Sequence, residues 1–263
     1  MKYFIKPLAK DLIIWYNIYC ISNCHFSFIL EEIVKGPLFY LIDYFRCVQP
    51  IQTFIYSVFG VLAFLFICMP VHECAHALAA KMLGDDTAER QGRLTLNPFA
   101  HIDKLGAIMM FVCSIGWAKP TPVDLRRCTK VKMRTANVIV SAAGPLSNLI
   151  MSFIFMILFR VLVLAGYHNA NFTFIQIAEV VYYVSTLNAF LAVFNLIPLP
   201  PFDGYHILAS FLPAKALYFF ERNAQIINLI LIILLVSGYA SIPISWLSGK
   251  IMDFFSFATS FIH

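Results

Sequence analysis

Three residues in the first third of the chain have types and a spacing that could hold a metal ion and activate water. His72 and His76 are four residues apart in "HECAH", so a helix places both imidazoles on one face. Two imidazole nitrogens at this spacing can bind one tetrahedral zinc ion at about 2.0–2.1 Å. Glu73 follows the first histidine, where its carboxylate could take a proton from zinc-activated water. The stretch therefore predicts two metal ligands and a general base.

The pattern H-E-x-x-H is typical of zinc-dependent proteases, and its setting here favours that interpretation. No charged residue occurs between Cys47 and Val71, so the motif follows a long apolar run. The alternative is a pair of core histidines that hydrogen-bond with the glutamate. Because ionisable residues inside a membrane are costly and usually mark function, the metal site is the favoured reading of the motif.

A catalytic zinc site needs a third protein ligand and an open position for water. Asp203 lies in "NLIPLPPFDGY" after 23 uncharged residues, where three prolines must break a helix. A broken helix at membrane depth can deliver one carboxylate to a metal, so Asp203 is the leading candidate. The alternative role for Asp203 is capping of the helix that follows. The weaker acidic candidates have basic neighbours or no site-forming residues beside them: Asp85, Asp86, Glu89, Asp103, Asp124, Glu179 and Glu221.

The composition of the chain indicates a membrane protein. Hydrophobic residues make up 60% of the 263 positions and charged residues only 13%, whereas a soluble domain carries about a quarter charged residues. The charges are clustered and leave uncharged runs, each close to the roughly 20 residues that a helix needs to cross the hydrocarbon core. These runs are 12–30, 47–71, 135–159, 180–202 and 223–249. The predicted fold is an all-α polytopic membrane protein with about five transmembrane helices.

A re-entrant or β-hairpin insertion is predicted between the motif-bearing helix and the next span. The apolar stretch 105–118 is too short to cross a bilayer. Before it, the turn at Asn97-Pro98 within "AERQGRLTLNPFAHID" suggests short strands at the membrane surface. Pro70 is expected to kink the motif-bearing helix. The small residues of "SAAGP", 141–145, would let another helix approach closely.

The basic residues and cysteines narrow the class of protein further. Between Lys119 and Arg134 there are six basic residues and one acid. A short basic loop of this kind stays cytoplasmic and fixes membrane orientation, so it favours a topology signal over nucleic-acid binding. The seven cysteines include no Cys-x-x-Cys pair, which indicates neither a disulfide framework nor a thiolate zinc site.

Five motifs together resemble those of the site-2 protease family of intramembrane zinc metalloproteases, and most closely its short bacterial type without a PDZ domain. The resemblance covers about residues 60–210. In order along the chain, the motifs are "HECAH", "GRLTLNPFAHID", "GWAKPTPV", "AAGPLSN" and "NLIPLPPFDG". On this basis we expect an N-terminal extension with a membrane or interfacial helix over 1–50, a catalytic core over 51–212, and a C-terminal transmembrane and amphipathic segment over 213–263.

The resemblance implies one catalytic zinc ion held by His72, His76 and Asp203, with Glu73 as general base. It also places Asn195 near the metal, where it helps to hold the scissile peptide or its oxyanion. Asn148 is a weaker candidate, for which helix packing is the favoured role. The segment "GWAKPTPV" is expected to be extended and to align an unwound substrate strand. Two further histidines near the cytoplasmic face are candidates to border the site: His101 and His206.

The function that these expectations favour is intramembrane proteolysis in the cytoplasmic membrane of a bacterium. The substrate would be the transmembrane helix of another membrane protein within the lipid bilayer. One alternative is an inactive membrane protein that keeps the fold for binding or chaperoning; the intact Glu73 and ligand set argue against it. Another is a metal transporter, which would be expected to have acids or histidines along a path, whereas the remaining histidines are scattered.

Overall fold

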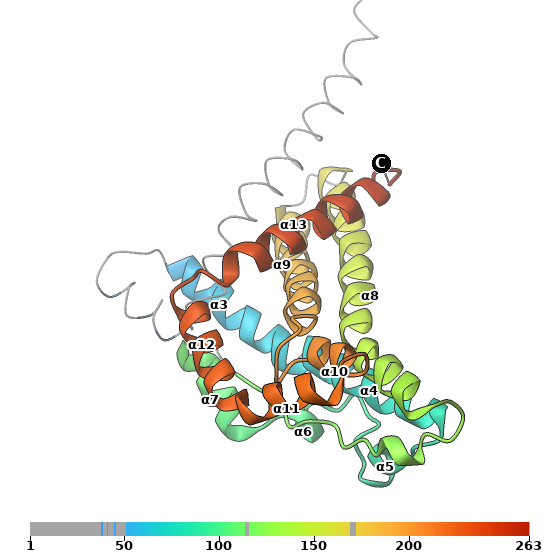
Figure 1. Ribbon diagram of the computed structural model, residues 1–263. Helices are drawn as coiled ribbons and strands as arrows, with labels where there is room; N and C mark the ends of the chain where they lie inside the picture. The colour runs from blue at the N-terminus through green and yellow to red at the C-terminus, as the bar shows by residue number, and fades with distance from the viewer. Residues whose placement is uncertain are drawn as a thin grey trace, which may run out of the picture.

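The computed structural model describes residues 51–113, 116–168 and 172–262, together with Leu38, Leu41 and Phe45. These residues form helices and connecting segments, with no strand among them, which confirms the predicted all-α fold (Figure 1). In chain order the elements are α3 (Ile51–Ala63), the π-helical turn η1 (Phe64–Cys68), α4 (Met69–Leu83), α5 (Thr87–Arg90), α6 (Pro98–His101), α7 (Lys104–Cys113), the 3₁₀ turn η2 (Leu125–Arg127), α8 (Met133–His168), α9 (Phe172–Asn195), α10 (Asp203–Ala209), α11 (Ala214–Arg222), α12 (Ala224–Val236) and α13 (Ser241–Ala258).

Three helical segments are long and apolar enough to cross a membrane: Val58–Leu83, Met133–Gly166 and Thr173–Asn195. A fourth span results if α11 and α12, which meet at an angle of 64°, count as one broken span. The predicted span 12–30 lies outside the described residues. The membrane character of the chain is thus supported by length and composition, and the total of five spans stays a prediction.

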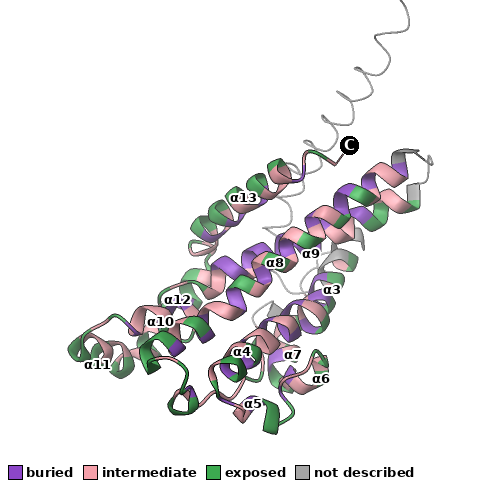
Figure 2. Cartoon of the chain, turned by 90° about the vertical axis from the view of Figure 1, so that its right-hand side faces the viewer, coloured by how far each residue is buried: buried purple, intermediate pink, exposed green. Residues whose placement is uncertain are grey.

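The antiparallel helices α8 and α9 form the centre of the molecule (Figure 1). Every residue from 182 to 190 of α9 is buried, which Figure 2 shows as a nearly continuous purple stretch. Phe159 of α8 packs against Tyr182 of α9 with ring centroids 5.0 Å apart. Because α9 is apolar on all sides, it suits a position enclosed by other helices. It packs against α8, α3 and α13, while α4 packs against α8.

The helix that carries "HECAH" contains a π-helical turn just before Pro70. The Met69 N–H donates to the carbonyl of Phe64, five residues earlier in the chain. Proline has no N–H to continue the regular four-residue pattern, and the wider turn lies where that pattern fails. The disruption predicted from Pro70 therefore takes the form of this turn. The helix continues as α4 and ends at Gly84, whose φ of 113° favours glycine.

The strands predicted before residue 104 do not form. The segment contains α5 and α6, and the β contact found in the described part of the chain is one isolated bridge between Ile102 and Ala118. Asn97 caps α6, since its Oδ1 accepts from the N–H of Phe99 at 3.1 Å. Pro98 occupies the first turn of that helix, where its fixed φ and missing N–H favour a helix start over a strand.

The apolar insertion folds back on itself after α7. A Cβ on Gly106 would lie closer than 3.0 Å to the backbone oxygen of Trp117, so the outgoing helix and the returning chain are in close contact. The return segment is joined to α6 by the Lys119 N–H, which donates to the His101 carbonyl at 2.8 Å. The folded-back insertion is therefore present, while its depth in a bilayer stays a prediction.

The apolar run 223–249, which was expected to form one span, is broken into two helices. The α12 helix has 13 residues, about 20 Å of helix, which is shorter than the roughly 30 Å hydrocarbon core. Gly238 then adopts a φ of 81°, a conformation that glycine enters without steric cost. The Ala240 N–H donates to the Leu234 carbonyl at 2.9 Å and ends the helix. From Ser241 the chain runs as α13 across α9 (Figure 1).

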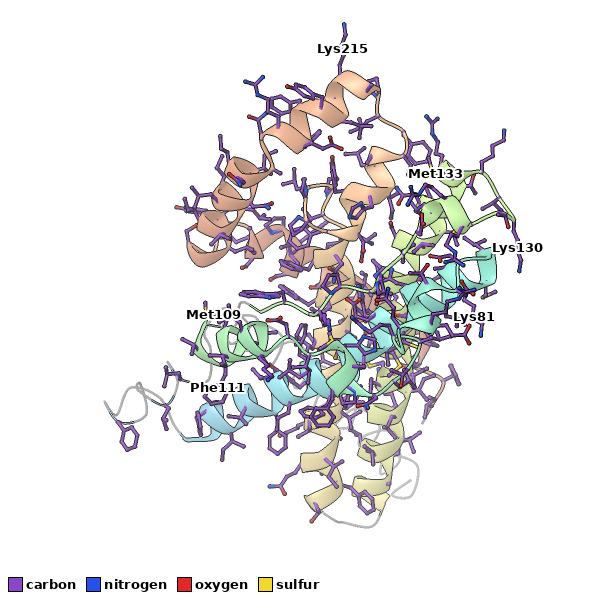
Figure 3. All side chains as sticks on the ribbon, turned by 90° about the horizontal axis from the view of Figure 1, so that it is seen from below. Lys81, Met109, Phe111, Lys130, Met133 and Lys215 are labelled. Atoms are coloured by element: carbon purple, nitrogen blue, oxygen red, sulfur yellow. The ribbon has the colours of Figure 1, made fainter. Side chains whose placement is uncertain are left out.

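Basic residues gather at the end of the molecule where α4 finishes. Lys130 Nζ donates to the Met82 carbonyl at 2.7 Å, and Lys81 pairs with Glu89 at 2.6 Å. Figure 3 shows Lys81 and Lys130 at one edge of the molecule and Met109, on α7, near the opposite edge. The cytoplasmic assignment of this end stays a prediction.

Candidate metal centre

His72, His76 and Asp203 converge on one point. The histidines lie one turn apart on α4, and Asp203 is the first residue of α10. Asp203 Oδ2 lies 3.2 Å from His72 Nε2 and 3.4 Å from His76 Nε2, and the two Nε2 atoms are 3.0 Å apart. One potential ligand atom from each of the three side chains lies within 4.8 Å of the other two. Among the described residues, this is the group of histidine, cysteine and acidic side chains that could hold a metal ion.

The chemistry and geometry of this group fit a zinc ion. Three donors of a tetrahedral zinc, each roughly 2 Å from the metal, are separated by about 3.3 Å, close to the separations found here. Asp203 Oδ2 is buried and makes no hydrogen bond within the described residues, as expected of an atom placed for a cation. The carboxylate is therefore available as an anionic ligand.

The break after α9 places Asp203 where the prolines predicted it. The α9 helix ends at Asn195, and a Cβ on Gly204 would lie closer than 3.0 Å to the Leu196 carbonyl. Only a glycine allows α10 to start so close to the preceding chain. The N-cap of α10 is Phe202, so the structure does not give Asp203 the alternative role of capping residue.

The α10 helix is fixed to α8 by one polar side chain. Asn137 Nδ2 donates to the His206 carbonyl at 2.7 Å and to Ser210 Oγ at 2.9 Å. These two contacts hold the helix that carries Asp203 against the helix that faces the histidines. A ligand from a broken segment thereby gains a rigid position.

One face of α8 contacts both histidines through residues spaced four apart. The Val140 carbonyl accepts from His76 Nδ1 at 2.7 Å, and the Asn148 side-chain amide lies 3.2 Å from His72 Nδ1. Between them, a Cβ on Gly144 would be closer than 3.0 Å to both imidazoles. The close helix approach predicted from "SAAGP" is confirmed, and Gly144 is what brings α8 against the metal ligands. Sequence reasoning missed this role, although the spacing of 140, 144 and 148 is that of one helix face.

Glu73 is held by Thr121, a residue that sequence reasoning did not single out. Glu73 Oε2 accepts from the Thr121 N–H at 2.9 Å and from Thr121 Oγ1 at 2.7 Å. Thr121 lies in the non-helical segment 116–124, which contains "GWAKPTPV". That segment is anchored at Lys119, whose N–H donates to His101 and whose carbonyl accepts from Arg93 Nη2. A fixed, non-helical chain therefore runs beside the candidate base.

The other residues considered from sequence lie in different surroundings. Asn195 Nδ2 donates to the Leu191 carbonyl at 2.9 Å within its own helix, and its role at the metal stays a prediction. His101 is fully buried and its Nε2 lies 2.8 Å from the Thr95 carbonyl, so it supports the loop. His206 is exposed. Asp85 is buried and accepts from the Asp124 N–H at 2.7 Å.

Comparisons with known proteins relate the chain to zinc metalloproteases. Residues 164–238, which include Asp203, match the model of peptidase family M50. YwhC of Bacillus subtilis (strain 168), assigned by its name to the zinc metalloproteases, is 42% identical over 172 residues, covering 62% of this chain and 75% of YwhC. Rip2 of Mycolicibacterium smegmatis (strain ATCC 700084 / mc(2)155), with the same assignment, is 27% identical over 219 residues, covering 82% of this chain and 79% of Rip2. No solved structure gives a significant match.

Proposed function

Because the chain belongs to peptidase family M50, the family of the site-2 protease zinc metalloproteases, we propose that it is an intramembrane zinc endopeptidase that cleaves transmembrane segments of membrane-protein substrates. The observation that carries the proposal is the convergence of His72, His76 and Asp203 beside Glu73. Two of these ligands and the base lie on a helix of the candidate span Val58–Leu83. If this span crosses the bilayer, the proposed hydrolytic site lies within the membrane.

The side chains of the site divide the work of peptide hydrolysis. His72, His76 and Asp203 would hold zinc, which supplies a Lewis acid that polarises the scissile carbonyl and activates water. Glu73 takes the proton from the attacking water and delivers it to the leaving amine. Thr121 donates two hydrogen bonds to one carboxylate oxygen of Glu73, which orients the base and leaves the other oxygen for proton transfer.

The substrate must reach this site in an extended form, because a helical peptide bond is shielded by its own hydrogen bonds and side chains. The non-helical segment around Thr121 lies beside the base, and we assign it to aligning the unwound substrate strand. Asn195 ends α9 at the break that leads to Asp203. We assign its amide to holding the scissile peptide or its oxyanion, which requires it to exchange its bond with Leu191 for one with substrate.

The setting for this reaction is a lipid bilayer. The candidate spans and the family make the chain an integral membrane protein. The similar proteins come from two bacteria, which supports a location in a bacterial cytoplasmic membrane. The substrate class that fits is a membrane protein with a transmembrane helix, which can enter between the helices and unwind at the base.

The variant Glu73→Gln tests the proposal in purified, detergent-solubilised protein. Gln keeps the size of the side chain but cannot accept the proton from water. We expect cleavage of a model single-pass substrate to fall by about 10²–10⁴-fold, with one zinc per chain retained. Cleavage is measured by gel shift of the labelled substrate, and zinc by elemental analysis.

Glu89→Gln is the matched control, because Glu89 is an exposed glutamate paired with Lys81 on the far side of Gly84. It should leave cleavage and zinc content unchanged. A Glu73→Gln protein that cleaves as fast as wild type would overturn the assignment of the base. Wild-type protein that binds zinc but cleaves no transmembrane substrate would favour the inactive binding function instead.

A further inference from the structure

We propose that Asn148 is a positioning residue for the metal centre: its side-chain Oδ1 accepts a hydrogen bond from the Nδ1–H of His72. The inference deepens the proposed function and rests on it, because it assumes that His72 Nε2 faces the metal. It assigns an acceptor to the second ring nitrogen of this ligand, which has no other hydrogen-bond partner among the described residues.

Asn148 is buried and lies against His72. Its exposed fraction is 1%, and its amide nitrogen is 3.2 Å from His72 Nδ1. Its Oδ1 is also buried, yet makes no hydrogen bond within the described residues. Leaving a buried amide oxygen unpaired is unfavourable, so this orientation of the amide is unfavourable as it stands.

The tautomer of His72 explains how the amide is oriented. A neutral imidazole carries one N–H, and a nitrogen that binds a metal must be the one without hydrogen. His72 Nε2 lies 3.2 Å from Asp203 Oδ2 and 3.0 Å from His76 Nε2, which makes Nε2 the ligand atom. Nδ1 therefore carries the hydrogen and needs an acceptor. An amide nitrogen cannot accept it, but the amide oxygen can.

Rotating the amide of Asn148 by half a turn resolves both problems. The oxygen and nitrogen of an asparagine amide have nearly the same shape, and which one occupies a position is decided by hydrogen bonding. After rotation, Oδ1 lies where Nδ2 is found, within reach of His72 Nδ1. The unpaired acceptor then gains a donor, and the donor of the metal ligand gains an acceptor.

His76 has an equivalent partner on the same face of α8. Its Nδ1 lies 2.7 Å from the Val140 carbonyl, an acceptor that cannot be exchanged for a donor. Both ligands would thus donate Nδ1–H to acceptors two turns apart on α8, with Gly144 between them. Such outer partners fix the orientation of the ring, and their loss typically weakens metal binding about 10–100-fold.

The test measures zinc affinity of the full chain in detergent by competition with a chromophoric chelator. Asn148→Leu removes the amide with little change in volume and should weaken zinc binding about 10–100-fold. Asn148→Asp keeps an acceptor oxygen at the same place, so its affinity should stay within about threefold of wild type, since carboxylate partners of metal-bound histidines are common. If Asn148→Leu does not fold, the aspartate variant alone decides.

Asn188→Leu is the matched control for packing. Asn188 is a fully buried asparagine of α9 that donates to the Val184 carbonyl at 2.9 Å and to Cys68 Sγ at 3.2 Å. Like Asn148, it has a buried Oδ1 without a hydrogen bond in the described residues. Its replacement should leave zinc affinity unchanged, with a lowered melting temperature of the zinc-free protein.

Three results would overturn the role of Asn148. The first is a zinc affinity of Asn148→Leu within about threefold of wild type, well short of the expected loss. The second is a loss of zinc affinity in Asn188→Leu equal to that in Asn148→Leu. The third is a loss of zinc affinity of about tenfold or more in Asn148→Asp. Wild-type protein that takes up no zinc would instead overturn the metal centre itself, and the proposed function with it. The two failures are therefore distinguishable.

Discussion

Two stretches of α8 carry buried polar groups, and they use them differently. In the metal-facing stretch, Val140–Asn148, three residues contact the histidines of α4. They are Val140 through its carbonyl, Gly144 through its lack of a side chain, and Asn148 through its amide. The second stretch, which we call the packing stretch, begins one turn later at Ser152. There, Ser152 Oγ donates to the Ser185 carbonyl of α9 at 2.8 Å, and Ser185 Oγ donates back to the Ser152 carbonyl at 2.7 Å.

The difference lies in which polar atoms are satisfied. The two serines of the packing stretch satisfy each other, as polar groups that hold membrane helices together do. Beside the metal-facing stretch, Asn148 Oδ1 and Asp203 Oδ2 are both buried without a hydrogen bond in the described residues. Buried polar atoms are almost always paired. The amide rotation proposed above pairs Asn148 Oδ1 with His72, which leaves Asp203 Oδ2 as the acceptor at this site that a metal ion would satisfy. The same helix thus serves catalysis at one end and assembly further along.

The largest effect in this comparison is expected from Gly144→Ala. The added methyl group would lie closer than 3.0 Å to both imidazoles, and overpacking of about 1–3 kcal/mol corresponds to a zinc affinity roughly 5–150-fold weaker. Chelator competition measures it. Gly60→Ala is the control, since its methyl group would clash as severely with Tyr183, away from the metal. Equal zinc affinities in the two variants would remove the distinction between the stretches.

An effect of comparable size, on kcat instead of zinc affinity, is expected from Thr121→Val, which probes the support of the base outside the helices. The variant keeps the backbone N–H but loses the hydroxyl that donates to Glu73. A hydrogen bond to a charged group contributes about 1.5–3 kcal/mol, so kcat for a transmembrane substrate should fall at least about tenfold, with zinc content unchanged. Thr121→Ser should restore the rate, and Thr129→Val, an exposed threonine, should not change it. Wild-type kcat in Thr121→Val would show that the hydroxyl does not orient Glu73.

The smallest effect is expected from Ser185→Ala in the packing stretch. It removes one of the two reciprocal bonds with Ser152. Such interhelical bonds contribute about 0.6 kcal/mol on average in membranes, so unfolding in mixed detergent should shift only slightly, and zinc affinity should not change. A marked loss of zinc affinity in this variant would mean that the two stretches are coupled.

The ligands themselves could be predicted because their signals are local. His72, Glu73 and His76 follow from the spacing within one helix. Asp203 stands out because prolines interrupt an apolar run just before it. Their meeting depends on α10 returning to α4, which no local pattern specifies; here the resemblance to a known family supplied what spacing could not.

The supporting contacts could not be predicted because they join distant parts of the chain. Thr121 and Glu73 are 48 residues apart, and Asn148 and His72 are 76 residues apart. Asn148 was expected mainly to pack, yet it lies beside a ligand. Gly144 and Asn148 lie four positions apart on one helix face, which indicates a close contact with another helix. That pattern is equally typical of plain helix packing, so it could not identify a contact with a metal ligand.

Two errors of the sequence interpretation have local causes. The stretch "AERQGRLTLNPFAHID" suggested short strands with a turn at Asn97-Pro98, but the Asn97 cap and Pro98 start a helical turn there instead. The apolar run 223–249 suggested one span, although Gly238 breaks it with a φ of 81°. In both places a turn signal in the sequence outweighed the hydrophobic pattern.

X-ray absorption spectroscopy of the purified chain, loaded with one equivalent of zinc, tests the metal centre most directly. The account predicts a first shell of nitrogen and oxygen only, with two imidazole nitrogens at about 2.0–2.1 Å. In Asp203→Ala, one protein oxygen ligand should be lost from that shell. A sulfur ligand at about 2.3 Å, supplied by a cysteine such as Cys68 or Cys74 of the same span, would contradict it, as would a shell unchanged by the loss of Asp203.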